Sequence, residues 1–295
     1  MHRLAFVLLI GCCLSKPATA EPPAFDGQLA LQHIANQLAY GPRTPEHQNA
    51  KQQTLKYIQQ HLAPLSNSLV TQSFSAYDLQ GTNLWASFNG NRDAAQRLIF
   101  GAHWDSRLHA DQDPEVNHRH KPVLGANDGA SGVAVLLELA RILAISSPPV
   151  TVDLVFFDLE DMGDIDGRPY AIGASQFVLK NPNYRPQAGI IVDMVCDKNL
   201  TIPRELYSQT RARSLMDKLW NIAKQQRATA FKNRPGQYIL DDHLPFLDAG
   251  LKVVDFIHYP FPDYWHTTAD TIDKCSASSL QQVGDVLSAF TYSYY

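Results

Sequence analysis

Val152-Asp153-Leu154-Val155-Phe156-Phe157-Asp158-Leu159-Glu160-Asp161 is the stretch of sequence that decides the fold. Apart from Asp153, the residues up to Phe157 are apolar, and an almost continuously apolar strand is typical of a sheet that is covered on both faces. Acidic residues follow at once. The same order, an apolar run and then a polar residue, occurs at three other places: Leu98–Ala102 before His103, Gly189–Val192 before Asp193, and Leu251–Ile257 before a Pro-rich loop that ends at His266.

Helical segments are expected around these runs. One is Val133–Ala144, which is closed by Ser146-Ser147-Pro148-Pro149, and another is Gln28–Leu65, whose apolar residues recur three and four apart. Gly41–Pro45 interrupts the second segment, so two helices are expected there. Asn83–Phe88 is a further expected strand. The alternation of strands and helices predicts an α/β protein, a three-layer α/β/α sandwich with a mixed, mostly parallel central sheet.

Composition limits the classes of protein that this chain can belong to. Of its 295 residues, 45% are apolar and 18% are charged, which favours a folded chain with a sizeable core. No linker or repeat divides it, so residues 21–295 are expected to form a single domain. The formal net charge of −4 gives no basic surface for nucleic acid. We expect a monomer.

The first twenty residues have the features of a signal peptide. Met1–Arg3 is basic, Leu4–Leu14 is apolar but too short to span a bilayer, and Ala18-Thr19-Ala20 offers small residues for cleavage before Glu21. This predicts export, to the periplasm or the medium, without a transmembrane helix. An alternative is that Leu9-Ile10-Gly11-Cys12, which resembles a bacterial lipobox, is cleaved before Cys12 and carries a lipid anchor there.

Two cysteines remain after such a cleavage, Cys196 and Cys275. They are too few for a disulfide framework, and neither lies in a zinc-binding CxxC pair. In an oxidising compartment they can bond to each other if the fold brings them together, which the sequence leaves open.

The polar residues at the ends of the expected strands suggest a metal site. Sites in open α/β sheets form at the carboxyl ends of the strands, and a catalytic zinc takes about three nitrogen or oxygen ligands. Taken singly, His103 is explained as a core imidazole and Asp128 as a helix cap. The acids at the sheet edge are harder to explain in this way, because an unpaired buried charge is costly. A metal site is therefore the better hypothesis for the whole set: His103, Asp128, Asp161, Asp193 and His266.

Six segments, from about Tyr40 to Asp273, resemble a known superfamily. Four are similar to the co-catalytic zinc aminopeptidases, which share their fold with the animal-type glutaminyl cyclases: Gly101–Ser106, Gly125–Gly132, Phe156–Asp161 and His266–Thr271. Two more look like the glutaminyl cyclase (glutaminyl-peptide cyclotransferase) versions: Asp241-Asp242-His243-Leu244-Pro245-Phe246 and Pro260-Phe261-Pro262-Asp263-Tyr264-Trp265-His266. One HxD motif is weak evidence, but six segments in the same order are strong evidence.

The resemblance implies a role for each matching residue. Asp128, Asp161 and His266 are expected to bind one zinc ion, and Glu160 is expected to be the general acid and base. Asp193 and Asp241 are expected to belong to a network of acids beside Glu160. The expected substrate contacts are those of His103, Phe261 and Trp265.

The implied reaction converts the N-terminal glutamine of a peptide or protein to pyroglutamate and releases ammonia. Zinc polarises the γ-amide carbonyl as a Lewis acid. Glu160 takes a proton from the α-amino group and returns it to the departing ammonia, which requires a pKa near neutrality. Burial beside other acids raises the pKa of a carboxyl group in this direction.

Two alternatives stay open. The five candidate ligands also suit a two-zinc aminopeptidase, in which Glu160 activates a water molecule. A non-catalytic binding protein on the same fold is the third hypothesis, but it predicts that the base is lost, and Glu160 is present.

Two features depart from the cyclase pattern. Asp161 stands where cyclases usually carry Glu, and Met162–Tyr170 lacks the Trp-bearing loop of the animal enzymes. His109, His118 and His120 are expected to lie in a solvated loop rather than at a second metal.

Overall fold

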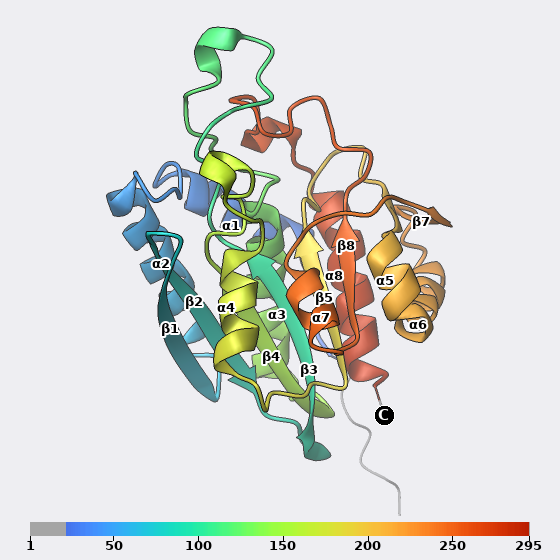
Figure 1. Cartoon of the computed structure of the whole chain (residues 1–295). Helices are drawn as coiled ribbons and strands as arrows, with labels where there is room; N and C mark the ends of the chain where they lie inside the picture. The colour runs from blue at the N-terminus through green and yellow to red at the C-terminus, as the bar shows by residue number, and fades with distance from the viewer. Residues whose placement is uncertain (1–21, 295) are drawn as a thin grey trace, which may run out of the picture.

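The computed structural model describes residues 22–294, which build a six-stranded sheet with strand order β1-β2-β4-β3-β5-β8 (Figure 1). The neighbours β4, β3, β5 and β8 are parallel, while β2 is antiparallel to β4 and β1 is antiparallel to β2. The predicted mixed, mostly parallel sheet is thus confirmed. The strands are β1 (Ser68–Ala76), β2 (Leu79–Phe88), β3 (Asp93–His103), β4 (Val150–Phe157), β5 (Ala188–Asp193) and β8 (Val253–Ile257).

Helices cover both faces of this sheet. On β3, Leu98, Phe100 and Ala102 belong to the core cluster shared with α1 (Gly27–Leu38), α3 (Ala130–Ile145) and α8 (Ala277–Tyr292). Ile99, on the opposite face, packs with residues of α4 (Ile172–Lys180) and α7 (His243–Asp248). In Figure 1 these two groups of helices lie behind and in front of the sheet. The three-layer prediction is confirmed, and the apolar runs are explained because alternate residues enter two different cores.

A glycine allows α3 to approach the sheet closely. A Cβ atom on Gly132 would lie 2.1 Å from the backbone oxygen of Val192 on β5, so a larger residue there would push the helix away from the sheet. Since Asp128 lies immediately before α3 and Asp193 ends β5, this contact also sets the distance between two of the candidate ligands.

The remaining elements complete the layers. The helical segment predicted within Gln28–Leu65 forms α1 and α2 (Gln48–Leu62), with the break between them where it was expected. The sequence did not predict β1, nor a small two-stranded sheet that pairs β6 (Ile202–Arg204) with β7 (Phe231–Pro235) beside α5 (Leu206–Arg211) and α6 (Arg213–Gln225). Short 3-10 helices occur at Val116–His118, Ile165–Gly167 and Ile272–Lys274.

The question of the two cysteines is answered by the fold. Cys196, after β5, and Cys275, before α8, form a disulfide between positions 79 residues apart. The predicted signal peptide and the alternative lipid site at Cys12 lie outside the described residues. Within residues 22–294, no helix combines the length and the apolar character needed to cross a bilayer.

Candidate metal centre

The candidate ligands meet at the carboxyl edge of the sheet, as the strand pattern predicts. His103 ends β3, Asp193 ends β5, and Asp161 follows β4 in the turn that also carries Glu160. Asp128 lies just before α3, and His266 lies in the loop between β8 and α8. These loops gather at the top of Figure 1. All five side chains are at least nine-tenths buried.

Asp128 lies between the two imidazole rings. Its Oδ1 is 3.1 Å from Nε2 of His103, and its Oδ2 is 3.6 Å from Nε2 of His266. The same Nε2 of His103 is also 3.1 Å from Oδ1 of Asp193. Likewise, the same Nε2 of His266 is 3.2 Å from Oδ1 of Asp161. The carboxylate of Asp128 is therefore shared by two adjoining sets of nitrogen and oxygen atoms.

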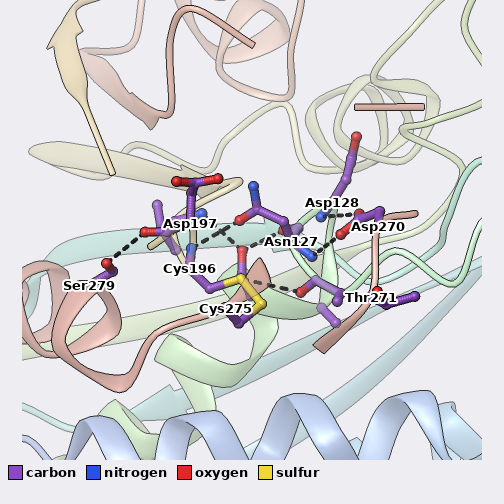
Figure 2. The surroundings of a disulfide bond; sticks show 12 residues. Asn127, Asp128, Cys196, Asp197, Asp270, Thr271, Cys275 and Ser279 are labelled. Atoms are coloured by element: carbon purple, nitrogen blue, oxygen red, sulfur yellow. Dashed lines mark hydrogen bonds between the residues drawn. A yellow bond between two sulfur atoms is a disulfide. The ribbon is translucent and has the colours of Figure 1, made fainter. Parts of the chain in front are cut away.

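Helix capping, the simpler explanation of Asp128, is excluded. The N-cap of α3 is Gly129, and no side chain caps that helix end. Instead, the backbone of the preceding turn is held by Asp270, whose two carboxylate oxygens accept hydrogen bonds from the N–H groups of Asn127 and Asp128 (Figure 2). The side chain of Asp128 is left free to face the two histidines.

These atoms fit a metal ion. There are two groups of three residues whose ligand atoms lie within 4.8 Å of one another: His103–Asp128–Asp193 and Asp128–Asp161–His266. In the second group, Oδ2 of Asp161 is buried without a hydrogen-bond partner. Carboxylate oxygen and imidazole nitrogen are ligands that zinc takes, and three such ligands with an open position are typical of catalytic zinc sites.

A second layer of polar groups orients the ligands. Oδ1 of Asp105 lies 3.3 Å from Nδ1 of His103, and the carboxylate of Asp105 also accepts hydrogen bonds from the N–H groups of Glu160 and Asp161. Outer contacts of this kind fix the ring orientation and tautomer of a ligating histidine. Asp105 thus connects the turn after β4 to the end of β3.

On the other side of the site, Arg107 binds the turn that carries Asp161. Its guanidinium donates to the backbone oxygens of Asp161 and Gly163, and to Asp111. Oδ1 of Asp111 lies 3.5 Å from Nδ1 of His266. The sequence did not single out Arg107, Asp111 or Asp270, although all three lie within or close to motifs that it did single out.

Glu160 is a carboxyl group with an unusual environment. It is only 6% exposed, and burial, followed by the neighbouring charges of Asp241 and Asp242, raises its pKa well above the ordinary value, against the opposing effect of His103. Burial also raises the pKa of Asp193, to about 7, although His103 opposes the shift. Raised pKa values of this kind are typical of groups that exchange protons near neutral pH.

Glu160 lines a cavity that has both polar and apolar walls. The lining includes Asp128, Asp193, Asp241 and His266, together with Phe261 and Trp265. Trp265 stacks on His266 with 3.7 Å between ring centroids, and Phe261 stacks on Trp265 at 4.5 Å. Tyr170 and Leu240, which the sequence did not assign to the pocket, line the same cavity.

The other predicted residues are placed as follows. His103 is 1% exposed and lies inside the ligand set, rather than among the lining residues of the cavity. His118 is 39% exposed and lies 3.6 Å from Asp113. In the described part of the chain, the groups that can hold a metal ion do not include His109, His118 or His120, and one further group consists of Asp241, His243 and Asp255.

Comparisons with known proteins agree with this fold. A solved glutaminyl cyclase from Bacteroides thetaiotaomicron is 32% identical, with a TM-score of 0.87 over 93% of this chain and 100% of that one. A structure described as a leucine aminopeptidase precursor from the same organism is 33% identical, with a TM-score of 0.87 over 92% of this chain and 99% of that one.

A curated relative is more distant. The glutaminyl-peptide cyclotransferase of Bos taurus is 23% identical over 237 residues, which is 69% of this chain and 64% of that protein. The chain thus spans less than two thirds of the length of the curated cyclotransferases that it matches. The predicted resemblance to glutaminyl cyclases is confirmed. Residues 83–291 match the model of peptidase family M28, and the chain therefore belongs to peptidase family M28.

Proposed function

We propose that this chain is a zinc-dependent glutaminyl-peptide cyclotransferase, which converts an N-terminal glutamine to pyroglutamate and releases ammonia. The observation that carries the proposal is the position of Glu160, whose buried carboxyl group shares one cavity with three candidate metal ligands and with the stacked rings of Phe261 and Trp265. The similarity of this chain to solved bacterial glutaminyl cyclases, over most of its length, supports this activity.

Asp128, Asp161 and His266 are the proposed ligands of one zinc ion, which when bound polarises the γ-amide carbonyl of the substrate. Trp265 and Phe261 are the proposed apolar walls for the glutamine side chain. Nε2 of His103 lies 3.1 Å from Asp128 and 3.1 Å from Asp193; in this proposal His103 holds the carboxylate of Asp128 in place, and Asp193 holds His103.

Glu160 is the proposed proton carrier. Its carboxylate accepts a proton from the substrate's α-amino group while that nitrogen bonds to the γ-amide carbon. The carboxyl group then gives the proton to the amide nitrogen, the carbon–nitrogen bond breaks, and ammonia leaves. Burial first, and then neighbouring acids such as Asp241, raise the pKa of Glu160, which is the direction that a group serving as base and then as acid needs.

A zinc aminopeptidase is the second candidate. The observation that favours it is the additional ligand group His103–Asp128–Asp193, which shares Asp128 with the first group and offers a place for a second zinc ion. In that enzyme Glu160 takes the proton of the attacking water and passes it to the amine that leaves.

An assay with a glutamine-initiated peptide separates the two. We expect mass spectrometry to show the loss of one ammonia from the peptide, stopped by a chelator and restored by zinc. Release of a free N-terminal amino acid would assign the chain to the aminopeptidases instead. Two zinc ions per chain in the active protein would point the same way.

Glu160→Gln tests the assigned base. We expect turnover to fall by a factor of about 10² to 10⁴, while zinc still binds. Glu138→Gln is a matched control, because Glu138 is also buried but pairs with Arg141 on α3, away from the cavity. Near-normal activity of the Glu160→Gln protein would show that the base is wrongly assigned.

The N-terminal features support the further proposal that the chain is exported and acts on peptides or proteins outside the cytoplasm. Labelling with radioactive palmitate would distinguish the alternative lipid anchor at Cys12 from cleavage before Glu21.

A further inference from the structure

A groove of about 300 Å³ lies beside the candidate site. We call it the side groove and define it by six of its lining residues: Asp164, Tyr170, Leu240, Asp241, Leu244 and Asp248. Three of them, Tyr170, Leu240 and Asp241, also line the cavity that contains Glu160. The two hollows therefore adjoin, and a peptide whose first residue occupies the cavity has the side groove within reach of its next residue.

The side groove combines apolar walls with acids. Leu240 is 57% exposed, and Leu244 and Pro245 continue the apolar surface beside it. The residues that line the groove include no lysine, arginine or histidine. Such a surface fits a ligand with a hydrocarbon stem and a positive end.

The acids of the groove differ in how far their charges are balanced. Asp248 forms an ion pair with Arg211 at 2.7 Å, and Asp241 is 2% exposed within the acidic cluster around Glu160. Asp164 is exposed, and among the described residues its carboxylate forms no ion pair or hydrogen bond. Asp164 is thus the acid in this groove that is available to a charged ligand.

We infer that the side groove binds the side chain of the second residue of the substrate peptide and favours a lysine or arginine there. The position of that residue rests on the proposed function, which places the N-terminal residue in the adjoining cavity. The stem of a long cationic side chain packs on Leu240 and Leu244, and its charged end remains near Asp164 at the solvent. A glutamate in the same place meets only acids and is disfavoured.

The expected preference is modest because the ion pair is exposed. Such pairs change a binding constant by up to about fivefold, and salt weakens them. We therefore expect kcat/KM for a Gln-Lys peptide to exceed that for an otherwise identical Gln-Glu peptide by more than this, since repulsion adds to attraction. The Gln-Met peptide, which keeps a long stem without charge, should lie between them.

Asp164→Asn is the decisive variant, and Asp166→Asn is its matched control. Both residues lie in the same loop with positive φ, 59° and 53°, a conformation that Asn adopts as readily as Asp. Asp166 pairs with Arg168 at 2.7 Å and does not line the groove. We expect Asp164→Asn to lower kcat/KM for the Gln-Lys peptide by about threefold to fivefold, to leave Gln-Met nearly unchanged, and to raise Gln-Glu. Asp166→Asn should change none of them by as much as twofold.

The outcomes separate this inference from the proposed function. If all three peptides are cyclised at equal rates, or if the two variants have equal effects, the inferred role of the side groove is wrong while the cyclase assignment stands. If free glutamine is released instead of ammonia, the cyclase assignment fails, but the order of the peptides still tests the groove. If the chain turns over none of the peptides, their affinities for the zinc-loaded protein are measured by calorimetric titration. Affinities in the order Gln-Lys, Gln-Met, Gln-Glu support the inference, and any other order contradicts it.

Discussion

The backbone N–H of Asp128 donates a hydrogen bond of 3.1 Å to Oδ2 of Asp270, a residue 142 positions later in the chain. Oδ1 of the same carboxylate accepts a 2.9 Å hydrogen bond from Asn127, as Figure 2 shows. Asp270 is 1% exposed. One buried carboxylate thus fixes the turn that presents Asp128 to both histidines, and it lies in the same loop as His266.

Asp270→Asn should weaken zinc binding. An amide has one oxygen acceptor, so its NH₂ group would face one of the two N–H donors and that hydrogen bond would be lost. Loss of an outer contact of a metal ligand typically costs about 10-fold to 100-fold in metal affinity, and we expect a loss in this range in a competition titration with a chromophoric zinc chelator.

Asp273→Asn is the control for this titration. Asp273 lies three residues later, is exposed, and pairs with Lys274 at the surface, so its variant should bind zinc as the unchanged protein does. Equal zinc affinities for the Asp270 and Asp273 variants would contradict the role given to Asp270.

Trp265→Ala should weaken substrate binding more than zinc binding. Trp265 stacks between Phe261 and His266 and lines the cavity. Because burying about 55 Å² of apolar surface is worth about 1.4 kcal/mol, a factor of about ten in binding, we expect loss of this wall to raise KM by about tenfold with a smaller change in kcat. Trp265→Phe keeps a ring and should recover most of the loss. Unchanged steady-state kinetics of the alanine variant would remove Trp265 from the substrate pocket.

The sequence predicted those parts of the site that the sheet itself positions. His103, Asp193 and the Glu160-Asp161 pair stand at or just after the ends of parallel strands, and parallel strands bring their carboxyl ends to one edge. Once the strands were recognised from their apolar runs, the meeting of these side chains followed from the fold.

Asp128 and His266 lie in loops and were still predicted, from their residue types and motifs, but the contacts that position them were beyond prediction. Asp270 and Arg107 reach the site because their loops fold over the sheet edge, and nothing in local spacing fixes such a path. The pairing of Cys196 with Cys275 depends on the same loops. β1 was missed because most of its residues are polar and at least partly exposed, so it lacks the apolar run that identified the inner strands.

Removal of the disulfide should destabilise the protein without unfolding it. The bond closes a loop of 79 residues, and a loop of this size is worth about 4.5 kcal/mol in the chain-entropy account, because the cross-link restricts the unfolded chain. We expect the double variant Cys196→Ser, Cys275→Ser to lose this amount in urea unfolding. A reducing agent should lower the stability of the unchanged protein by a similar amount and leave the double variant unaffected. A double variant as stable as the oxidised protein would contradict this expectation.

His243 should contribute to stability through a buried contact with Glu205. Its Nε2 lies 3.2 Å from Oε2 of Glu205, its Nδ1 lies 3.6 Å from Oδ2 of Asp255, and all three side chains are fully buried. Burial raises the pKa of Glu205, but His243 and the hydrogen bonds from Tyr207 and Ser208 outweigh it and lower the pKa. Burial raises the pKa of Asp255 well above its ordinary value. Glu205 is therefore the ionised partner at neutral pH.

His243→Leu leaves the carboxylate of Glu205 buried without its imidazole partner. We expect the free energy of unfolding, measured in urea, to fall by about 3 kcal/mol. Glu205→Gln in the same chain removes the buried negative charge that has lost this partner, so the double variant should be more stable than the sum of the two single changes predicts.

Because Glu205 has a lowered pKa in the folded state, its contribution to stability is present above its unfolded pKa of about 4.5 and is lost as the pH falls through the folded value. The difference between the unchanged protein and His243→Leu should therefore shrink in acid. Strictly additive variants, or a difference that grows as the pH falls, would contradict the pairing of His243 with Glu205.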